Sequence, residues 1–434
     1  MYVQPDFRTL NFAQSKKAPG LHATYPKYML KIKLLFILVC VAWMASAQRK
    51  VVFIIVDAIP ADVIENVATP MLDEISAQGG YTQAYVGGEK GGYSQSPTVS
   101  AVGYNHVLTG TWSNKHNVWD NDIESPNYNY WNVFRIAKAG NPALKTAIFS
   151  SWTDNRTKLV GEGLPAAGNL KFDYSFDGLE LDKARFPHTK DRVFMFNIDE
   201  AVSKEAARYI HENGPDLSWV YLEFTDDMGH GFGDSPQLID AVSKADVQIG
   251  RIWAAIQERQ KQFGEEWMIV ITTDHGRDAA TGRDHGNHSD RERTTWIATN
   301  AAPLNSHFKD TPAAVDIAPS ILNFMKITAP EETRNEFDGV PFYGPVSLSN
   351  LKAVRQGNKV TLTWTALNPE GNAEIKISAT NNFKTGTPDI YKTIGTAAVK
   401  QGKFEFELPA PASEFYKIML VGPNNTTNVW LTNK

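Results

Sequence analysis

The sequence predicts an α/β fold in which a mainly parallel sheet is sandwiched by helices, followed by a small C-terminal β-sandwich. Three short apolar runs, at residues 51–56, 219–225 and 268–273, predict buried strands of the first part. Segments of helical period alternate with these strands, so helices are expected on both faces of the sheet. From residue 345 onward the pattern changes to alternating strands without helices, which predicts a second unit.

Helices are expected where apolar residues recur at helical spacing and where Gly or Pro ends the segment. Thr69-Pro70 opens the first helix, which ends at Gly79. Further helices are predicted at residues 130–138, 198–213 and 237–260, and one more strand at residues 145–150. Residues 155–188 are rich in Gly, Asp and aromatic side chains, which predicts an irregular loop or cap over the site.

Residues 345–434 are expected to form a domain separate from the α/β domain at residues 48–344. Short strands are predicted at residues 359–364, 373–378, 403–408 and 415–421, with Gly, Asn and Pro turns between them. This spacing predicts a small β-sandwich. The segment resembles a fibronectin type III module in having Trp364 in an early strand and Tyr416 at the start of a late one. The C-terminal domain is expected to contact a glycan or a cell surface.

Residues 1–47 are predicted to be a leader and signal peptide. Lys31 and Lys33 precede the apolar run at residues 34–45, and Ala45-Ser46-Ala47 supplies the small residues of a cleavage site. The apolar run is too short to span a membrane stably. Residues 1–28 fit neither a signal nor a domain, so Met29 is the alternative start. The protein is therefore expected to be exported, periplasmic or secreted, with no membrane span after cleavage.

Cleavage after Ala47 would change both the charge and the cysteine content. Residues 1–47 hold six of the 43 basic and one of the 48 acidic residues, so the mature chain keeps 37 and 47, a net charge of −10. An acidic protein lacks a general basic surface for nucleic acid. Cys40, the single cysteine, would be removed, so no disulfide is expected.

Each of the three apolar runs of the first domain leads into an acidic residue: Asp57, Asp226 and Asp274. His230 follows Asp226 by four residues, and His275 is adjacent to Asp274. Open α/β folds bind their ligands at the carboxyl edge of the sheet. Carboxylates and imidazoles together suit zinc better than most other metals. The sequence therefore predicts a metal site at this edge, with two ions.

A further histidine is needed to complete one of the two ligand sets. His285 and His288 both lie in the segment 284–288. His285 is favoured because Gly286 lets the backbone pass close to the site, and His288 stays open as the alternative. The remaining histidines of the mature chain are expected to be structural or solvated: His106, His116, His188, His211 and His307.

The nucleophile is expected in residues 97–110, a loop that leads into a helix. Thr98 and Ser100 both offer a hydroxyl there. A hydroxyl at a helix start lies near the positive end of the helix dipole and near free N–H groups that also attract phosphate. Metal coordination can activate it without a histidine base. At this point either residue qualifies, and a helix cap is the alternative role for each.

Taken in order, these motifs resemble the alkaline phosphatase superfamily, in its type I phosphodiesterase/nucleotide pyrophosphatase branch. The resemblance extends from residue 51 to about residue 344. The matching motifs are the strand ending in Asp57, Leu108-Thr109-Gly110, the run His-Asn-Val-Trp-Asp-Asn at residues 116–121, Asp226 and His230 with Gly233, Asp274-His275-Gly276, and residues 311–322 and 338–341.

The resemblance implies a role for each candidate residue. In the branch, the nucleophile lies ten residues before the Gly of Leu-Thr-Gly, three after a Pro and 21 before a phosphoryl-binding Asn, and all three counts lead to Ser100. Asn121 would donate its amide to a phosphoryl oxygen. One metal would be held by Asp57, Asp274 and His275, with Ser100 beside it, and the other by Asp226, His230 and His285.

The resemblance also implies an activity, namely hydrolysis of small phosphate esters with two divalent metal ions, zinc by preference, and a phosphorylated serine intermediate. A phosphodiesterase or nucleotide pyrophosphatase is expected first. A phosphomonoesterase, a transferase and an inactive surface-binding relative are the alternatives, and the full ligand set argues against the last.

The sequence departs from the branch pattern directly after the nucleophile. Ala-Val-Gly-Tyr follows Ser100 where the branch has Phe-Pro-Asn-His after a Thr, so nucleotide specificity is not implied. Lys190 and Arg192 resemble a phosphate-binding pair of some monoesterases. Their place at the start of a helix favours a solvated cap instead.

Overall fold

A computed structural model describes residues 48–409 and 413–432 of the chain. The predicted signal peptide lies outside the described residues. The described residues belong to one compact unit. Within the described part, no helix is both long and apolar enough to cross a membrane.

The centre of the unit is a seven-stranded sheet with the order β2-β7-β6-β1-β5-β3-β4. Neighbours pair in parallel from β6 to β4, whereas β7 is antiparallel to both β6 and β2. The predicted mainly parallel sheet is thus confirmed. Its strands are β1 (Arg49–Val56), β2 (Gly80–Tyr85), β3 (Thr146–Ser150), β4 (Tyr174–Phe176), β5 (Leu217–Leu222), β6 (Glu266–Thr272) and β7 (Thr294–Thr299).

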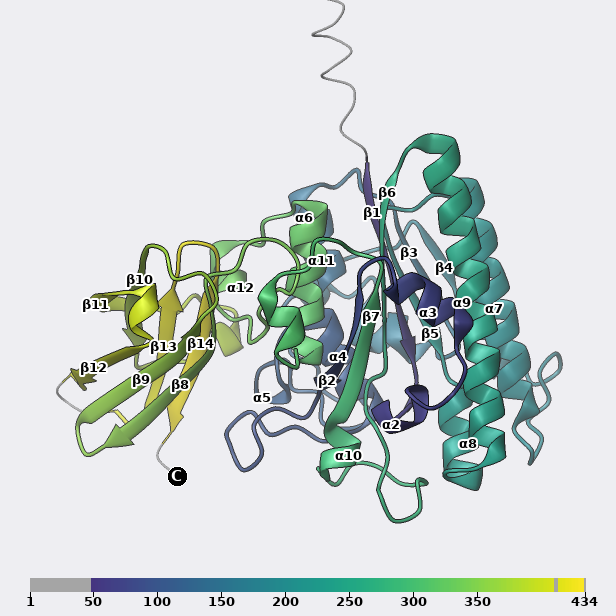
Figure 1. Ribbon diagram of the computed structural model, residues 1–434, viewed down its shortest axis with the longest axis horizontal. Helices are drawn as coiled ribbons and strands as arrows, with labels where there is room; N and C mark the ends of the chain where they lie inside the picture. Colours follow the sequence, from purple (N-terminus) through teal and green to yellow (C-terminus); the bar gives the residue numbers. More distant parts are fainter. Residues whose placement is uncertain (1–47, 410–412, 433–434) are drawn as a thin grey trace, which may run out of the picture. The chain divides into compact units, whose positions relative to one another are not determined.

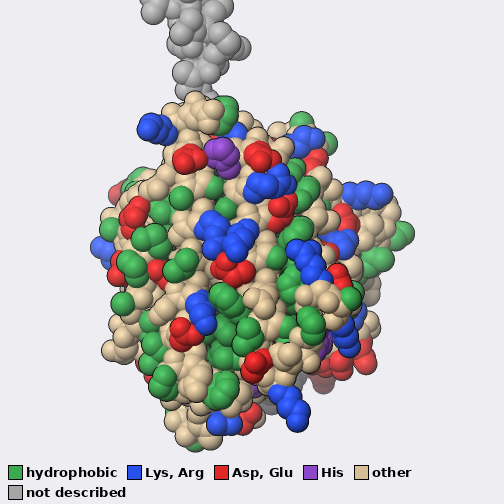
Figure 2. All heavy atoms as spheres, turned by 90° about the vertical axis from the view of Figure 1, so that its right-hand side faces the viewer, with side chains coloured by type: hydrophobic (Ala, Val, Ile, Leu, Met, Phe, Trp, Pro, Cys, Tyr) green, Lys and Arg blue, Asp and Glu red, His purple; other side chains and the backbone are tan. Residues whose placement is uncertain are grey.

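Helices cover both faces of this sheet (Figure 1). Alternate residues of β1 belong to two different cores, with Phe53 in one and Ile54 in the other. The first core includes α4 (Ser100–Thr109), α6 (Val133–Gly140) and α11 (Ile317–Met325), and the second α3 (Pro70–Ser76), α7 (Val193–Asn213) and α9 (Pro236–Phe263). Figure 2 shows the face of α7 and α9, where basic, acidic and hydrophobic side chains are mixed.

The strand predicted before Asp226 needs correction at its end. The strand expected to continue to Thr225 ends at Leu222, because its pairing with β1 ends there and the backbone amides of Glu223 and Phe224 then donate to the Asp199 carboxylate. The chain continues as α8 (Phe224–Phe232), so Asp226 and His230 lie on a helix rather than beyond a strand.

The sheet strands β2, β4 and β7 were not predicted. β2 and β4 are edge strands with partly exposed residues, so neither shows a buried apolar run. The segment 155–188 also contains regular pieces, including a short π-helix at Asn155–Leu159 and the strand β4.

The C-terminal residues form two antiparallel sheets, ordered β11-β10-β13-β14 and β12-β9-β8 (Figure 1). The four predicted strands are present, and β8, β11 and β14 add to them. The two sheets share one hydrophobic core. The strands are β8 (Leu348–Gln356), β9 (Lys359–Ala366), β10 (Asn372–Ser378), β11 (Lys392–Ala398), β12 (Lys403–Glu407), β13 (Phe415–Val421) and β14 (Thr426–Thr432).

Candidate active site

Two groups of acidic and histidine side chains lie beside the carboxyl ends of β1 and β6. Asp57 directly follows β1, while Asp274 and His275 come just after β6. Asp226 and His230 come from α8, one helical turn apart, and His285 from the loop before α10 (Asp290–Arg293). The ligand atoms of each group lie within 4.8 Å of one another.

The first group, Asp57, Asp274 and His275, is buried, with at most 2% of any residue exposed. Nδ1 of His275 lies 2.8 Å from the Gly276 carbonyl oxygen, to which only a protonated nitrogen can donate. Nε2 then presents its lone pair to the carboxylates, 3.1 Å from Asp274 Oδ2 and 3.8 Å from Asp57 Oδ1.

These two carboxylate oxygens are buried without a hydrogen-bond partner. Burial, together with the neighbouring carboxylate of Asp274, raises the pKa of Asp57 well above its usual range. Burial also lowers the pKa of His275. Two buried acceptor oxygens and an imidazole lone pair that converge on one point fit a divalent cation, which would stabilise the ionised carboxylates. The donor set of nitrogen and oxygen suits zinc.

The other oxygen of Asp57 is held by two tyrosines that sequence reasoning missed. The hydroxyls of Tyr104 and Tyr221 donate to Asp57 Oδ2 over 2.5 and 2.6 Å, and the two hydroxyls lie 2.8 Å apart. The sequence spacing could have revealed Tyr104, because it lies four residues after Ser100 and therefore on the same side of α4. Asp57 thus has one oxygen fixed by hydrogen bonds and one free for a cation.

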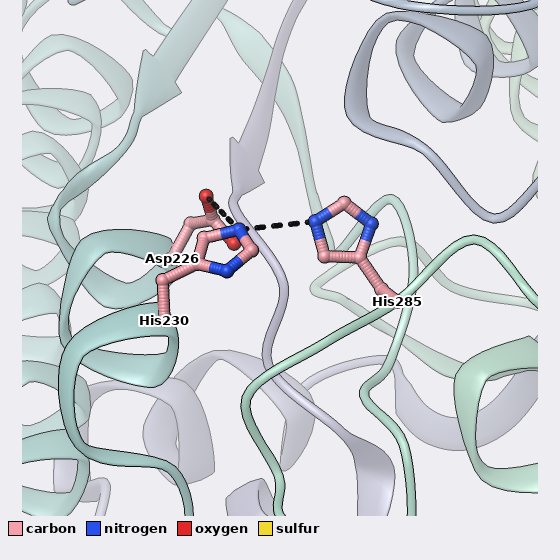
Figure 3. A group of neighbouring side chains, drawn as sticks. All are labelled: Asp226, His230 and His285. Atoms are coloured by element: carbon pink, nitrogen blue, oxygen red, sulfur yellow. Dashed lines mark hydrogen bonds and ion pairs between the residues drawn. The ribbon is translucent and has the colours of Figure 1, made fainter.

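In the second group the side chains of Asp226, His230 and His285 point toward a common centre (Figure 3). His230 Nε2 lies 3.4 Å from Asp226 Oδ2 and 3.1 Å from His285 Nε2. The three ligand atoms lie close enough together to bind one cation. The side chain of His230 is 44% exposed, so this group is open to solvent where the first is closed.

Two residues orient the second group. His285 Nδ1 lies 2.9 Å from the Thr98 carbonyl oxygen, which leaves Nε2 as the ligand atom. The buried guanidinium of Arg277, also missed from the sequence, donates to both the side chain and the backbone oxygen of Asp226. The two groups adjoin each other, because the rings of His275 and His285 stack with centroids 3.9 Å apart.

Ser100 and Thr98 have different surroundings. Ser100 is the first residue of α4, and its Oγ lies 3.3 Å from His275 Nε2, against the first group. Thr98 Oγ1 instead accepts a hydrogen bond from the Gly286 amide, so this side chain positions the His285 loop. Neither hydroxyl caps α4, whose N-cap residue Val99 makes no side-chain cap bond.

Asn121 is brought to the start of α4 although it lies 20 residues further along the chain than Ala101. Its Oδ1 accepts a hydrogen bond of 2.9 Å from the Ala101 amide. Because Oδ1 accepts this hydrogen bond, the orientation of the Asn121 amide is fixed and its Nδ2 hydrogens remain as donors.

The other candidates lie away from both groups. His288 Nε2 contacts the Ser96 carbonyl oxygen at 2.5 Å, so His288 joins neither metal group. Arg192 precedes α7 and pairs with the buried Asp227, with 47% of its side chain exposed. His106, His116 and His307 are buried, whereas His188 and His211 are exposed.

Comparison with known proteins gives a family match and similar folds. The model of the family "Type I phosphodiesterase / nucleotide pyrophosphatase" matches residues 51–320. The structure is similar to human ectonucleotide pyrophosphatase/phosphodiesterase 5, at 15% identity and a TM-score of 0.44 over 65% of this chain and 96% of that one. It is also similar to a phosphonate monoester hydrolase of Agrobacterium radiobacter, at 13% identity and a TM-score of 0.47 over 73% and 89% of the two chains.

Proposed function

The chain belongs to the type I phosphodiesterase/nucleotide pyrophosphatase family. From this membership we propose that it is a two-metal phosphoric ester hydrolase, and from its N-terminal sequence that it is exported. A phosphodiester or a pyrophosphate is the proposed substrate, and a phosphorylated Ser100 the intermediate. The observation that carries the proposal is the place of Ser100 Oγ, 3.3 Å from His275 Nε2 and beside two buried carboxylate oxygens, Asp57 Oδ1 and Asp274 Oδ2, that have no hydrogen-bond partner.

Asp57, Asp274 and His275 would hold one ion, and Asp226, His230 and His285 the other. Two bound divalent ions, zinc by preference, would supply Lewis-acid stabilisation for the serine alkoxide and for the leaving oxygen. The protein contributes the orientation of these ligands, through the two tyrosines at Asp57 and through Arg277 at Asp226.

The residues of the chain then account for both halves of the reaction. Ser100 Oγ gives up its proton, which the leaving oxygen takes up, and forms a bond to phosphorus while the bond from phosphorus to the leaving oxygen breaks. The Asn121 amide donates to a non-bridging oxygen and stabilises the charge that develops there. In the second half a water oxygen forms a bond to phosphorus, the bond to Ser100 Oγ breaks, and Ser100 Oγ takes a proton from that water.

Hydrolysis of three p-nitrophenyl esters tests the activity and separates it from its alternatives. With zinc added, bis(p-nitrophenyl) phosphate should give a higher kcat/KM than p-nitrophenyl phosphate, and p-nitrophenyl sulfate should react slowest. Faster reaction of the monoester would favour the phosphomonoesterase. Failure on all three esters, together with no zinc detected by mass spectrometry after dialysis, would contradict the proposal.

The proposal of export rests on the N-terminal sequence and has its own test. Cleavage after Ala47 predicts that the protein recovered from outside the cytoplasm begins at Gln48. N-terminal sequencing of the exported protein measures this directly. A chain that stays in the cytoplasm with residues 29–47 intact would contradict export.

A further inference from the structure

A large groove lies between the α/β part and the two C-terminal sheets. Its volume is about 1150 Å³. One wall is the loop 86–94 with Tyr85 and Trp112, and the other consists of β8 and β14, which are edge strands of their sheets. None of the residues assigned to the candidate metal groups lines it.

The groove continues toward the candidate active site. A second depression of about 500 Å³ shares Gly91, Gly92, Tyr93 and Thr432 with the groove and adds Gln95 and Trp119. We call the two together the sandwich groove. Its far wall, Trp119, lies two residues before Asn121, so the two Cα atoms are within about 7.6 Å of each other. Asn121 in turn contacts α4 beside Ser100.

The lining of the sandwich groove is aromatic and polar without a dominant charge. Tyr85 stacks on Trp112 and Tyr93 on Trp430, with ring centroids 5.9 and 5.4 Å apart. Trp119 is 42% exposed and Tyr85 36% exposed. Among the described residues, four basic and three acidic side chains line the larger part, and two of the acids, Asp316 and Asp338, are buried in pairs with His307 and Lys115. The remaining positive excess is small, which disfavours a polyanion such as nucleic acid.

The walls of the groove are held together by buried polar contacts. Lys115 Nζ, in the α/β part, donates to Asn428 Oδ1 of β14 over 2.9 Å. Asn428 Nδ2 in turn donates a hydrogen bond of 2.7 Å to the Phe337 carbonyl oxygen of the α/β part. Lys417 of β13 is only 1% exposed and pairs with Glu336. The groove is therefore preformed, which reduces the entropy that an extended ligand loses on binding.

We propose that the sandwich groove binds a neutral oligosaccharide chain, and that the phosphate ester substrate carries this chain on one side of its phosphorus. The second part rests on the function proposed above. Flat aromatic faces beside polar groups suit sugar rings, which have apolar faces and hydroxyl edges. The small charge excess of the lining suits an uncharged polymer better than a polyanion. The path past Trp119 leads such a chain to Asn121 and Ser100.

Binding tests the first part of the proposal. An array of neutral oligosaccharides is screened with the purified full-length protein, and the strongest binder is titrated in solution by calorimetry. Trp119→Ala and Tyr85→Ala should each weaken its Kd by about tenfold, and Trp119→Phe should retain most of the affinity. Phe263→Ala is the matched control, because Phe263 is 53% exposed and lies outside the groove.

Three binding results would overturn the proposal. These are no binding of any neutral oligosaccharide, unchanged affinity in both groove variants, and a preference for peptides over sugars in a parallel peptide array. Trp119 is an exposed loop residue, so its substitution leaves the fold intact. If Tyr85→Ala fails to fold, the affinity of Trp119→Ala decides the test alone. The thermal midpoint of each variant checks its folding.

Hydrolysis tests the second part with a matched leaving group. The p-nitrophenyl phosphodiester of the selected oligosaccharide should exceed methyl p-nitrophenyl phosphate in kcat/KM by about tenfold, and Trp119→Ala should abolish this preference. Equal rates on both esters would contradict the saccharide-bearing substrate while the hydrolase proposal stands. No reaction of either ester, with binding intact, would instead contradict the hydrolase proposal and leave the saccharide site supported.

Discussion

Ser100 and Thr98 lie two residues apart and have different surroundings. Ser100 Oγ contacts His275, whereas Thr98 accepts a hydrogen bond from Gly286. Ser100→Ala should therefore lower kcat on bis(p-nitrophenyl) phosphate by about 10³-fold or more, because the nucleophile is lost. Thr98→Val should lower this kcat far less, since it removes only one hydrogen bond to the His285 loop. Full activity of Ser100→Ala beside an inactive Thr98→Val would reverse the assignment.

Asp57 has one oxygen bound to two tyrosine hydroxyls and the other without a partner. Tyr104→Phe should weaken zinc affinity by about 10-fold or more, because residues that orient a metal ligand have effects of this size. Competition with a fluorescent chelator measures the affinity of the apoprotein. Tyr81→Phe is the control, since its hydroxyl bonds to Glu65 on the surface. Equal zinc affinity in the two variants would contradict the positioning role of Tyr104.

Helix α4 carries Ser100 and packs directly on the Asp274 segment. A Cβ at Gly103 would lie 2.6 Å from the Asp274 carbonyl oxygen and 2.7 Å from its Cβ. Gly103→Ala should therefore push α4 away, lower the free energy of unfolding by about 1–3 kcal/mol and weaken zinc binding. Chemical denaturation and zinc competition measure the two effects.

Gly231→Ala in α8 is the matched control for that substitution. No atom lies within 4 Å of a Cβ there, so helix propensity should raise stability by about 0.5–1 kcal/mol. Gly103→Ala with wild-type stability and zinc affinity would show that the close packing of α4 on Asp274 is unimportant.

The short helices Ser306–Lys309 and Ala314–Asp316 are joined by a buried ion pair. His307 Nε2 lies 2.8 Å from Asp316 Oδ2. Burial disfavours the charged ring, but the Asp316 carboxylate outweighs it, so the pKa of His307 is raised above its usual 6.5. The stabilisation is therefore complete below about pH 6.5 and is lost as the pH rises through the raised pKa.

His307→Gln should accordingly destabilise the protein by about 1–3 kcal/mol at pH 6 and by less at pH 9. Urea denaturation at the two pH values measures this difference. His211→Gln is the control, because its pair with Glu258 is exposed on both sides. A destabilisation by His307→Gln that does not change with pH would contradict the assignment of a charged His307.

At the scale of the whole molecule, the C-terminal sheets are joined to the α/β part through buried charges. Lys417 Nζ lies 2.6 Å from Glu336 and 2.7 Å from Asp389, and its side chain is 1% exposed. Lys417→Met should cost about 3–5 kcal/mol of unfolding free energy, because two buried carboxylates lose their cation. Lys359→Met, at an exposed pair with Glu405, should cost about 1 kcal/mol or less. Equal effects in chemical denaturation would contradict a structural role for the buried pair.

The sequence by itself determined the parts that depend on local pattern. Buried runs around Phe53, Val220 and Val270 predicted the central parallel strands, because a strand covered on both faces must be apolar throughout. The spacing of Asp226 and His230 marked them as a pair of metal-ligand candidates beyond a strand, but the helix α8 that carries both was not predicted. The edge strands β2 and β4 left no such pattern and were missed.

Only the tertiary structure decided which distant residues meet. His285 and His288 are three positions apart, yet His285 contacts His230 whereas His288 contacts the Ser96 carbonyl oxygen. The loop is fixed by hydrogen bonds to Ser96 and Thr98, which are about 190 positions earlier in the chain. Tyr221 and Arg277 reach the metal ligands through folding alone. The sandwich groove likewise exists because β14 packs beside the loop that precedes Ser100. Local spacing specifies faces and edges, whereas contacts between faces depend on the packing of the whole chain.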